Sequence, residues 1–318
     1  MVNFEILTPA KTTMGTSPWW DDAEQRLYWS DALGGLIYRT TPDGRELNLW
    51  KPADTAGVSS MVLRQQGGAI MASLSESTKR TGIRLFDFET NEVTTIDELE
   101  AGSPLLFNDS TTDSKGRLIT GHSTRPFWEG ASRSLRGQVH PPAKLYRIDA
   151  DQKLQLIDEG YGITNGPGVS PDGKRLYVSD SWANVVYAYD LDPETGSVSN
   201  RSEFASFVAR EDRGTNGLGD PDGIIVDSEG GVWITICRAG ELRRYSPEGQ
   251  LERTVALPIL SVTNATFGGP NMDIMFVTSL MEAGIQGVAA PGDGQVGGCL
   301  LAVHGLGVSG VPKVRYQG

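Results

Sequence analysis

A short pattern that recurs six times along the chain constrains the fold more than any other feature of the sequence. Each copy has a polar turn, often Asp-x-x-Gly, followed by a short apolar or aromatic strand that ends in Ser, Thr or Asp. The strand segments are residues 26–31, 69–73, 117–120, 175–180, 231–235 and 274–278. Successive copies are 42, 49, 58, 56 and 42 residues apart, counted from Leu27, Ala69, Leu118, Leu176, Val232 and Ile274. Spacing of this length is typical of the four-stranded blades of a β-propeller.

Further alternating segments with turn residues follow most copies, as in residues 36–39 before Pro42-Asp43-Gly44 and 242–245 before Pro247-Glu248-Gly249. Such alternation is typical of β-hairpins, and no segment has convincing helical periodicity. We therefore predict an all-β fold, a six-bladed β-propeller of four-stranded antiparallel blades, with residues 1–318 forming a single domain. Two unrelated β domains are the alternative, but they do not explain a repeat that runs from residue 20 to 280.

The two ends of the chain are expected to complete the ring. Residues 299–303 and 314–316 remain after the sixth copy and need a partner. The N-terminal segment 4–7 can supply a strand to the last blade, which would leave no exposed sheet edge.

Charge and composition exclude several classes of partner. The chain has 28 Lys and Arg residues against 40 Asp and Glu, a net charge of −12, which argues against nucleic acid. No stretch approaches the roughly 18 consecutive apolar residues of a membrane span, and no signal-like segment begins the sequence. Cys237 and Cys299 are too few for a disulfide framework and lack metal-site spacing. We expect a cytoplasmic monomer or homodimer that acts on a small molecule, without a membrane or nucleic-acid partner.

Three polar residues stand at matching positions in successive units. Asn108, Asn165 and Asp222 are 57 residues apart, and each precedes the polar turn of its unit. Because the inner strands of a propeller converge on its axis, we expect these side chains to meet at one mouth of the channel. Two carboxamides and a carboxylate suit a hard cation such as Ca²⁺ or Mg²⁺, and Mn²⁺ or Zn²⁺ less well. Local turn hydrogen bonds are the alternative for each residue.

A histidine and an insertion follow at the same mouth. His122 ends the strand that returns towards Asn108, and an imidazole there could act as a base near neutral pH, although a packing role is the alternative. The insertion of residues 123–142 carries arginines and aromatic residues, including Trp128. A loop of this length is usually a functional lid or a mobile segment, and these side chains could cap an anionic or aromatic ligand. A solvated loop without a ligand role is the alternative.

Several phrases occur in order along almost the whole chain: Ser17-Pro18-Trp19-Trp20-Asp21, Asn108-Asp109, Asn165-Gly166, Pro221-Asp222-Gly223, Thr266-Phe267-Gly268-Gly269-Pro270 and Gly307-Val308-Ser309-Gly310-Val311-Pro312. With them the chain resembles the gluconolactonase/regucalcin (senescence marker protein) family of six-bladed lactonase propellers. The last phrase is similar to the family's C-terminal strand.

The resemblance implies a divalent cation at the top of the channel, held by a Glu, two Asn and an Asp. Asn108, Asn165 and Asp222 match three of these ligands, and the Asp is also regarded as the general base or water-orienting carboxylate. Thr16 stands at the position of the Glu, and Leu106 stands where the family often has an Arg that contacts sugar hydroxyls. With one carboxylate fewer, a cation should bind more weakly. Leu106 indicates a less polar substrate than a sugar lactone.

Three functions remain open. The first is a hydrolase that opens a lactone or related ester, in which a cation polarises the carbonyl and activates water. Asp222 would be its base, with His122 as an auxiliary base or proton donor. The expected substrate contacts are Asn108, Thr16, Leu106 and Trp128. The second is a metal-free lyase, isomerase or cyclase that uses His122 and Asp222 in an apolar pocket, and the third is a non-catalytic ligand-binding propeller.

Overall fold

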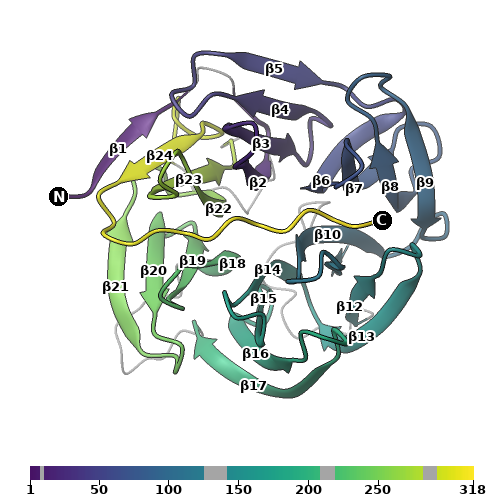
Figure 1. Cartoon of the computed structure of the whole chain (residues 1–318). Coiled ribbons are helices and arrows are strands. Elements are labelled where there is room, and N and C mark those ends of the chain that lie inside the picture. The colour runs from purple at the N-terminus through teal and green to yellow at the C-terminus, as the bar shows by residue number, and fades with distance from the viewer. Residues whose placement is uncertain (8–10, 125–141, 208–218, 282–291) are drawn as a thin grey trace.

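The computed structural model describes residues 1–7, 11–124, 142–207, 219–281 and 292–318. Within these ranges the chain forms strands and no helix, so none of the described segments is a helix that could cross a membrane. The strands make six four-stranded antiparallel sheets around a central axis (Figure 1). The predicted six-bladed propeller is confirmed.

The blades follow one another along the chain, and within each blade the strands run in order from the axis outwards. Blade 1 comprises β2 (Gly15–Asp21), β3 (Arg26–Asp31), β4 (Ile37–Thr40) and β5 (Leu47–Trp50). Blade 2 comprises β6 (Thr55–Leu63), β7 (Ala69–Ser75), β8 (Thr81–Phe86) and β9 (Val93–Glu98). Blade 3 comprises β10 (Leu105–Thr112), β11 (Leu118–Thr124), β12 (Ala143–Ile148) and β13 (Leu154–Tyr161).

Blade 4 comprises β14 (Thr164–Val169), β15 (Arg175–Asp180), β16 (Val185–Leu191) and β17 (Val198–Ser206). Blade 5 comprises β18 (Asp220–Val226), β19 (Val232–Cys237), β20 (Glu241–Tyr245) and β21 (Leu251–Ala256). Blade 6 comprises β22 (Val262–Gly268), β23 (Ile274–Ser279), β24 (Leu301–His304) and, as its outermost strand, β1 (Asn3–Ile6).

The recurring pattern of the sequence is the second strand of each blade. All residues of β11 and β19 are buried, because neighbouring blades cover both faces of each sheet. A strand covered on both faces has no polar side, which explains the continuous apolar runs. The cores lie between blades: Trp19, Met61 and Phe107, from three successive blades, belong to one cluster. Cys237 and Cys299 are free and buried.

The N-terminal strand closes the ring, as predicted. β1 pairs antiparallel with β24, with Phe4 opposite Val303 and Ile6 opposite Leu301. The sixth blade is therefore built from both ends of the described chain, and β1 takes the place of the fourth strand that each other blade has at its outer edge.

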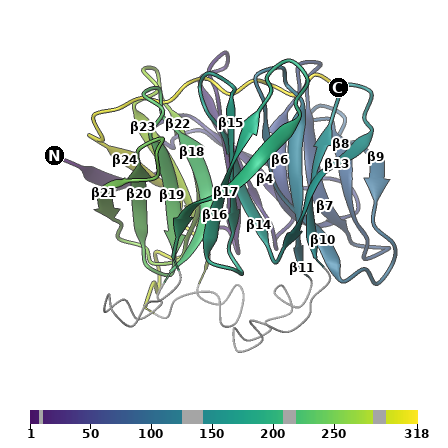
Figure 2. The same cartoon turned by 90° about the horizontal axis from the view of Figure 1, so that it is seen from below.

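The last residues do not form the C-terminal strand that the resemblance implied. Residues 305–318, which we call the C-terminal strap, cross one face of the ring (Figures 1 and 2, yellow). Among the described residues, the strap's only β-bridge is a single parallel one between Tyr316 and Arg64. The strap instead binds blades one after another: Gly310 N–H donates to Met272 O at 2.8 Å, and Tyr316 N–H donates to Leu63 O at 2.9 Å. A segment that crosses from blade to blade cannot extend one sheet.

The strap defines two ends of the channel. It contacts the turns that follow the inner strands: Ser228, after β18, donates to Ser309 O at 2.8 Å, and Gln317 donates to Gly116 O at 3.1 Å. We call this side the strap face. The opposite side, where β10, β14 and β18 begin, is called the mouth face.

Candidate functional site

All six inner strands lose register with their second strands at the same level, near the mouth face. The irregularities lie between residues 16 and 19, 58 and 60, 107 and 110, 165 and 168, 221 and 224, and 262 and 265. A β-bulge leaves residues unpaired in the ladder and re-aims their side chains. Asn108 and Asp222 lie within bulges, and Thr16 and Asn165 are the last paired residues before them. The four predicted ligand positions therefore occupy one level of the channel.

The structure brings the two predicted asparagine ligands into direct contact. Asn108 Nδ2 donates to Thr164 O at 2.8 Å and to Asn165 Oδ1. Asn165 Nδ2 donates in turn to Ser181 Oγ at 2.8 Å. These bonds fix the orientation of both amides, and no donor among the described residues reaches Asn108 Oδ1. That oxygen is left available to a ligand.

Asp222 has a carboxylate that the surrounding protein does not satisfy. Its backbone is held in place, since Ser179 Oγ donates to Asp222 O at 2.8 Å and Ser181 Oγ donates to Pro221 O at 2.6 Å. Its side chain keeps some accessible surface, yet no described residue donates a hydrogen bond to the carboxylate. Burial, and secondarily the charge of Asp109, raise the pKa of Asp222 well above its ordinary value. A bare carboxylate in a desolvated channel is suited to a cation or a proton.

Asp109 accepts hydrogen bonds from several blades. It belongs to the motif Asn108-Asp109 but was not among the predicted site residues. It is 3% exposed and accepts bonds from three other blades: from Thr16 Oγ1 at 3.1 Å, Asn264 Nδ2 at 2.9 Å and the Gly166 N–H at 2.9 Å. Burial raises its pKa to about 6, against the lowering effect of these donors and of the Lys313 charge. Its position beside Asn108, inside the same bulge, was the signal that could have found it. Asn264 was also missed, although it occupies the equivalent bulge of blade 6.

Thr16 and Leu106 lie in the inner strands of blades 1 and 3. The Thr16 hydroxyl donates a hydrogen bond to Asp109, so the lone pairs of Oγ1 remain free to act as a neutral oxygen ligand. Leu106 is 8% exposed and stands two residues before Asn108 in β10, towards the mouth face. An apolar side chain therefore occupies this part of the channel mouth.

His122 is at the predicted level but not in the channel wall. It pairs with Phe107 across β10 and β11, one strand outside Asn108. Its ring lies 4.8 Å from Phe107 and 5.1 Å from Tyr146 between ring centres, and it is 1% exposed. Neither ring nitrogen has a hydrogen-bond partner in the described part of the chain, and burial lowers the pKa of His122 to about 4. The structure thus does not bring this neutral imidazole together with Asn108, Asn165 and Asp222. Trp128 lies outside the described residues.

The donor set fits a hard divalent cation. Asp222 offers a carboxylate, and Asn108, Asn165 and Thr16 offer neutral oxygens at one level of the channel. The bare carboxylate and the free Asn108 Oδ1 are polar atoms that such an ion would satisfy. No group of three or more His, Cys, Asp or Glu residues that could hold a metal ion occurs among the described residues.

Comparisons with known proteins place the chain in a family. Residues 14–281 match the model of the SMP-30/gluconolactonase/LRE-like region. Pentonolactonase XacC of Haloferax volcanii is 31% identical over 96% of this chain and 94% of its own length. The 6-deoxy-6-sulfogluconolactonase of Pseudomonas putida is 30% identical over 96% of both chains. A solved luciferin-regenerating enzyme has a TM-score of 0.78 at 26% identity, with 96% of both chains covered. The resemblance seen in the sequence is confirmed, and the chain belongs to the SMP-30/gluconolactonase/LRE-like family.

Proposed function

We propose that the protein is a lactonase-like carboxylic ester hydrolase that opens a lactone ring with a divalent cation at the mouth of the propeller channel. The observation that carries this proposal is the bare, desolvated carboxylate of Asp222 at one level with the amides of Asn108 and Asn165. Two relatives at 31% and 30% identity are named lactonases, which supports the reaction class.

The ligand residues would be Asp222, Asn108, Asn165 and Thr16. Bound there, a divalent cation supplies a Lewis acid for the lactone carbonyl and lowers the pKa of a water molecule. The chain contributes orientation, because the amides of Asn108 and Asn165 are already fixed by hydrogen bonds before substrate arrives. Preformed geometry of this kind lowers the reorganisation needed in the transition state.

Asp222 is the proposed general base. Burial raises its pKa above the ordinary value of a carboxyl group, which makes the carboxylate a stronger base. Asp222 takes a proton from water as the water oxygen attacks the carbonyl carbon. The ring C–O bond then breaks, and Asp222 returns the proton it took from water to the departing ring oxygen, which becomes the alcohol of the product hydroxy acid.

We assign His122 at most the role of a hydrogen-bond donor, and not that of a base or a proton donor. With a pKa of about 4 the imidazole stays neutral at neutral pH and is a weak base. A neutral imidazole still carries one N–H, and both nitrogens of His122 lack a partner among the described residues. Its place behind Phe107 limits this role to substrates that extend from Asn108 towards blade 2.

The proposed substrate is a less polar lactone than a sugar lactone. Leu106 supplies no hydrogen bond at the channel mouth, and a buried hydroxyl without a partner costs about 1–3 kcal/mol. Thr16 in place of a carboxylate keeps the ligand set less anionic. Cytoplasmic location and a monomeric or dimeric state remain predictions from the sequence.

Elemental analysis of the purified protein and lactone hydrolysis test this proposal together. We expect one divalent ion per chain, loss of hydrolysis on chelation, and recovery with Ca²⁺, Mg²⁺, Mn²⁺ or Zn²⁺ added singly. Aliphatic γ- and δ-lactones should have higher kcat/KM than aldonolactones. Hydrolysis that is insensitive to chelator contradicts the cation chemistry. No hydrolysis of either lactone class would favour the metal-free or non-catalytic alternatives.

A further inference from the structure

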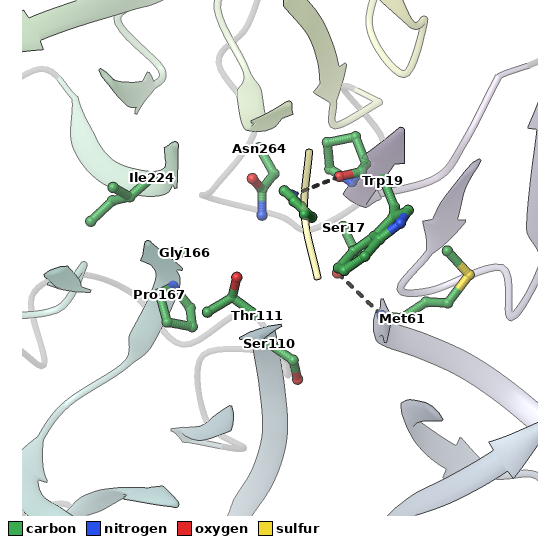
Figure 3. A pocket seen from close by; sticks show the side chains of 11 residues that line it. Ser17, Trp19, Met61, Ser110, Thr111, Gly166, Pro167, Ile224 and Asn264 are labelled. Carbon is green, nitrogen blue, oxygen red and sulfur yellow. Dashed lines mark hydrogen bonds between the residues drawn. The ribbon is translucent and has the colours of Figure 1, made fainter. Parts of the chain in front are cut away.

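The C-terminal strap sends a lysine into the channel from the face opposite the candidate cation site. Lys313 Nζ donates to Pro18 O at 3.2 Å and lies 5.3 Å from the ring centre of Trp19. Lys313 lines a cavity of about 10 Å³, room for about one water molecule, together with Gly166 and Asn264 (Figure 3). These last two residues donate hydrogen bonds to Asp109. The ammonium therefore lies beside the shell that holds the Asp109 carboxylate.

Lys313 and Asp109 are electrostatic partners inside the protein. Burial lowers the pKa of Lys313 to about 8, and the charge of Asp109 opposes that effect. One carbonyl and one aromatic ring are weak compensation for a buried ammonium, so it requires a counter-charge, and Asp109 is the carboxylate whose hydrogen-bond donors line the same cavity.

The strap fixes where this charge sits. On one side of Lys313, Gly310 is bonded to blade 6, and on the other Tyr316 is bonded to blade 2. The adjacent Val314 carbonyl accepts a bond from Thr112, and Arg315 pairs with Asp21. The position of the ammonium is thus imposed by contacts with several blades rather than by its own flexible side chain.

We propose that Lys313 is the internal counter-charge of Asp109, and that through this pair the C-terminal strap sets the cation affinity of the site at the channel mouth. The second part rests on the proposed cation site. Asp109 adjoins Asn108 and accepts a hydrogen bond from the Thr16 hydroxyl. A charge that offsets the charge of Asp109 therefore changes the electrostatic potential at two proposed ligands. A fixed positive charge also opposes a second cation in the same channel. Lys313 is a positioning residue, because it does not touch the proposed ligands or the substrate.

A double-mutant cycle measured in chelator tests the pairing without any metal. We expect Lys313→Met and Asp109→Asn each to lower the unfolding temperature by about 3–6 °C. The double variant should lose less than the sum of the two, because neither charge is then left alone. Arg315→Met is the matched control, since it removes the strap's ion pair with Asp21 and should be additive with Asp109→Asn.

Additive effects of Lys313→Met and Asp109→Asn would overturn the pairing. Should Asp109→Asn fail to fold, Lys313→Met is compared with Lys313→Arg, which keeps the charge. The pairing then requires the Met variant to be less stable than the Arg variant, and equal or reversed stabilities overturn it.

Calorimetric titration with Ca²⁺ and Mn²⁺ tests the second part. We expect Lys313→Met to lower the dissociation constant for the cation about three- to tenfold, because a repelling charge is removed. Lys313→Arg and Arg315→Met should stay within about twofold of the parent chain. An unchanged or higher dissociation constant in Lys313→Met overturns the proposal that the strap sets the cation affinity. Absence of cation binding in every variant, the parent included, overturns both this control and the proposed cation chemistry, while the chelator cycle still decides the pairing.

Discussion

The two ends of strand β18 carry two aspartates whose carboxylates differ in their hydrogen bonding. Asp227 follows the strand at the strap face and has no exposed side-chain surface. Its carboxylate accepts four bonds, from the backbone N–H groups of Glu229 and Gly231 and from the side chains of Trp233 and Arg244. Asp222, five residues earlier at the mouth face, has a desolvated carboxylate that no described residue bonds. A carboxylate that holds the fold together is saturated, whereas one kept for a ligand is left bare.

The structural aspartates recur from blade to blade, whereas the aspartate proposed to bind a ligand does not. Asp113 at the strap face of blade 3 accepts bonds from Lys115 N–H, Arg117 N–H and Arg117 Nε, as Asp227 does in blade 5. These aspartates belong to the recurring turn, and each stabilises its own blade. Asp222 belongs to the bulge level, where the blades do not repeat one residue but carry Thr16, Asn108, Asn165 and Asp222. A single site on the propeller axis is asymmetric, so it requires different residues at the bulges of the different blades.

Asp222→Asn should have the largest effect. The amide keeps the shape but loses the negative charge and the proposed base, so we expect kcat/KM for the best lactone to fall about 10⁴-fold. The unfolding temperature in chelator should stay equal or rise, because an uncompensated buried charge is removed. Steady-state kinetics and calorimetry check the two halves. Retained activity would contradict the proposed role of Asp222.

Asp227→Asn should do the reverse. Arg244 and Trp233 lose their shared acceptor charge inside the blade, so we expect the free energy of unfolding to fall by about 3–5 kcal/mol. The kcat/KM of the folded fraction should remain within about twofold of the parent value. Glu229→Gln is the control, because its exposed ion pair with the same Arg244 is worth less than about 1 kcal/mol. Chemical denaturation curves of the three proteins decide the matter.

The pH dependence of stability gives a sharper contrast within the channel. The pKa of Asp109 is about 6 in the folded chain, above its ordinary value of 3.8. Between these values the folded state binds more protons, so this contribution to stability is complete below about pH 4 and is lost as the pH rises through 6. Relative to Asp109→Asn in chelator, the parent chain should lose about 3 kcal/mol between pH 4 and 7. A difference that does not change with pH would show that Asp109 titrates normally.

The smallest expected effect concerns substrate choice at the channel mouth. Leu106→Arg should raise kcat/KM for aldonolactones over aliphatic lactones by about tenfold, since an arginine can bond sugar hydroxyls. Leu105→Arg is the matched control, because adjacent residues of a strand point to opposite faces. Equal shifts in both variants would mean that a general increase in positive charge, rather than the position of residue 106, changes the preference.

The fold could be predicted because its repeated element is the most buried one. Residues 26–31 and 175–180 are predicted as strands and are β3 and β15, whose residues are almost all buried and which follow polar turns that carry Asp. The ligand level could be predicted from equal spacing. The position of Asp109 beside Asn108 was a usable signal, but its bonds to three other blades were not predictable, and neither was the role of Lys313, because the path of the strap follows no periodic pattern. The sequence places His122 in the mouth, but strand alternation puts it on the same side as Leu118, which faces the core.

The pairing of β1 with β24 has a consequence for how the molecule assembles. Blades 1 to 5 consist of consecutive strands, so each can form soon after its residues leave the ribosome. Blade 6 cannot, because its outermost strand is made first and its neighbour β24 is made almost last. Joining such distant segments adds little entropy cost, since that cost grows only with the logarithm of the intervening length. Ring closure is therefore a late step of folding, and afterwards no blade can unfold without opening the ring.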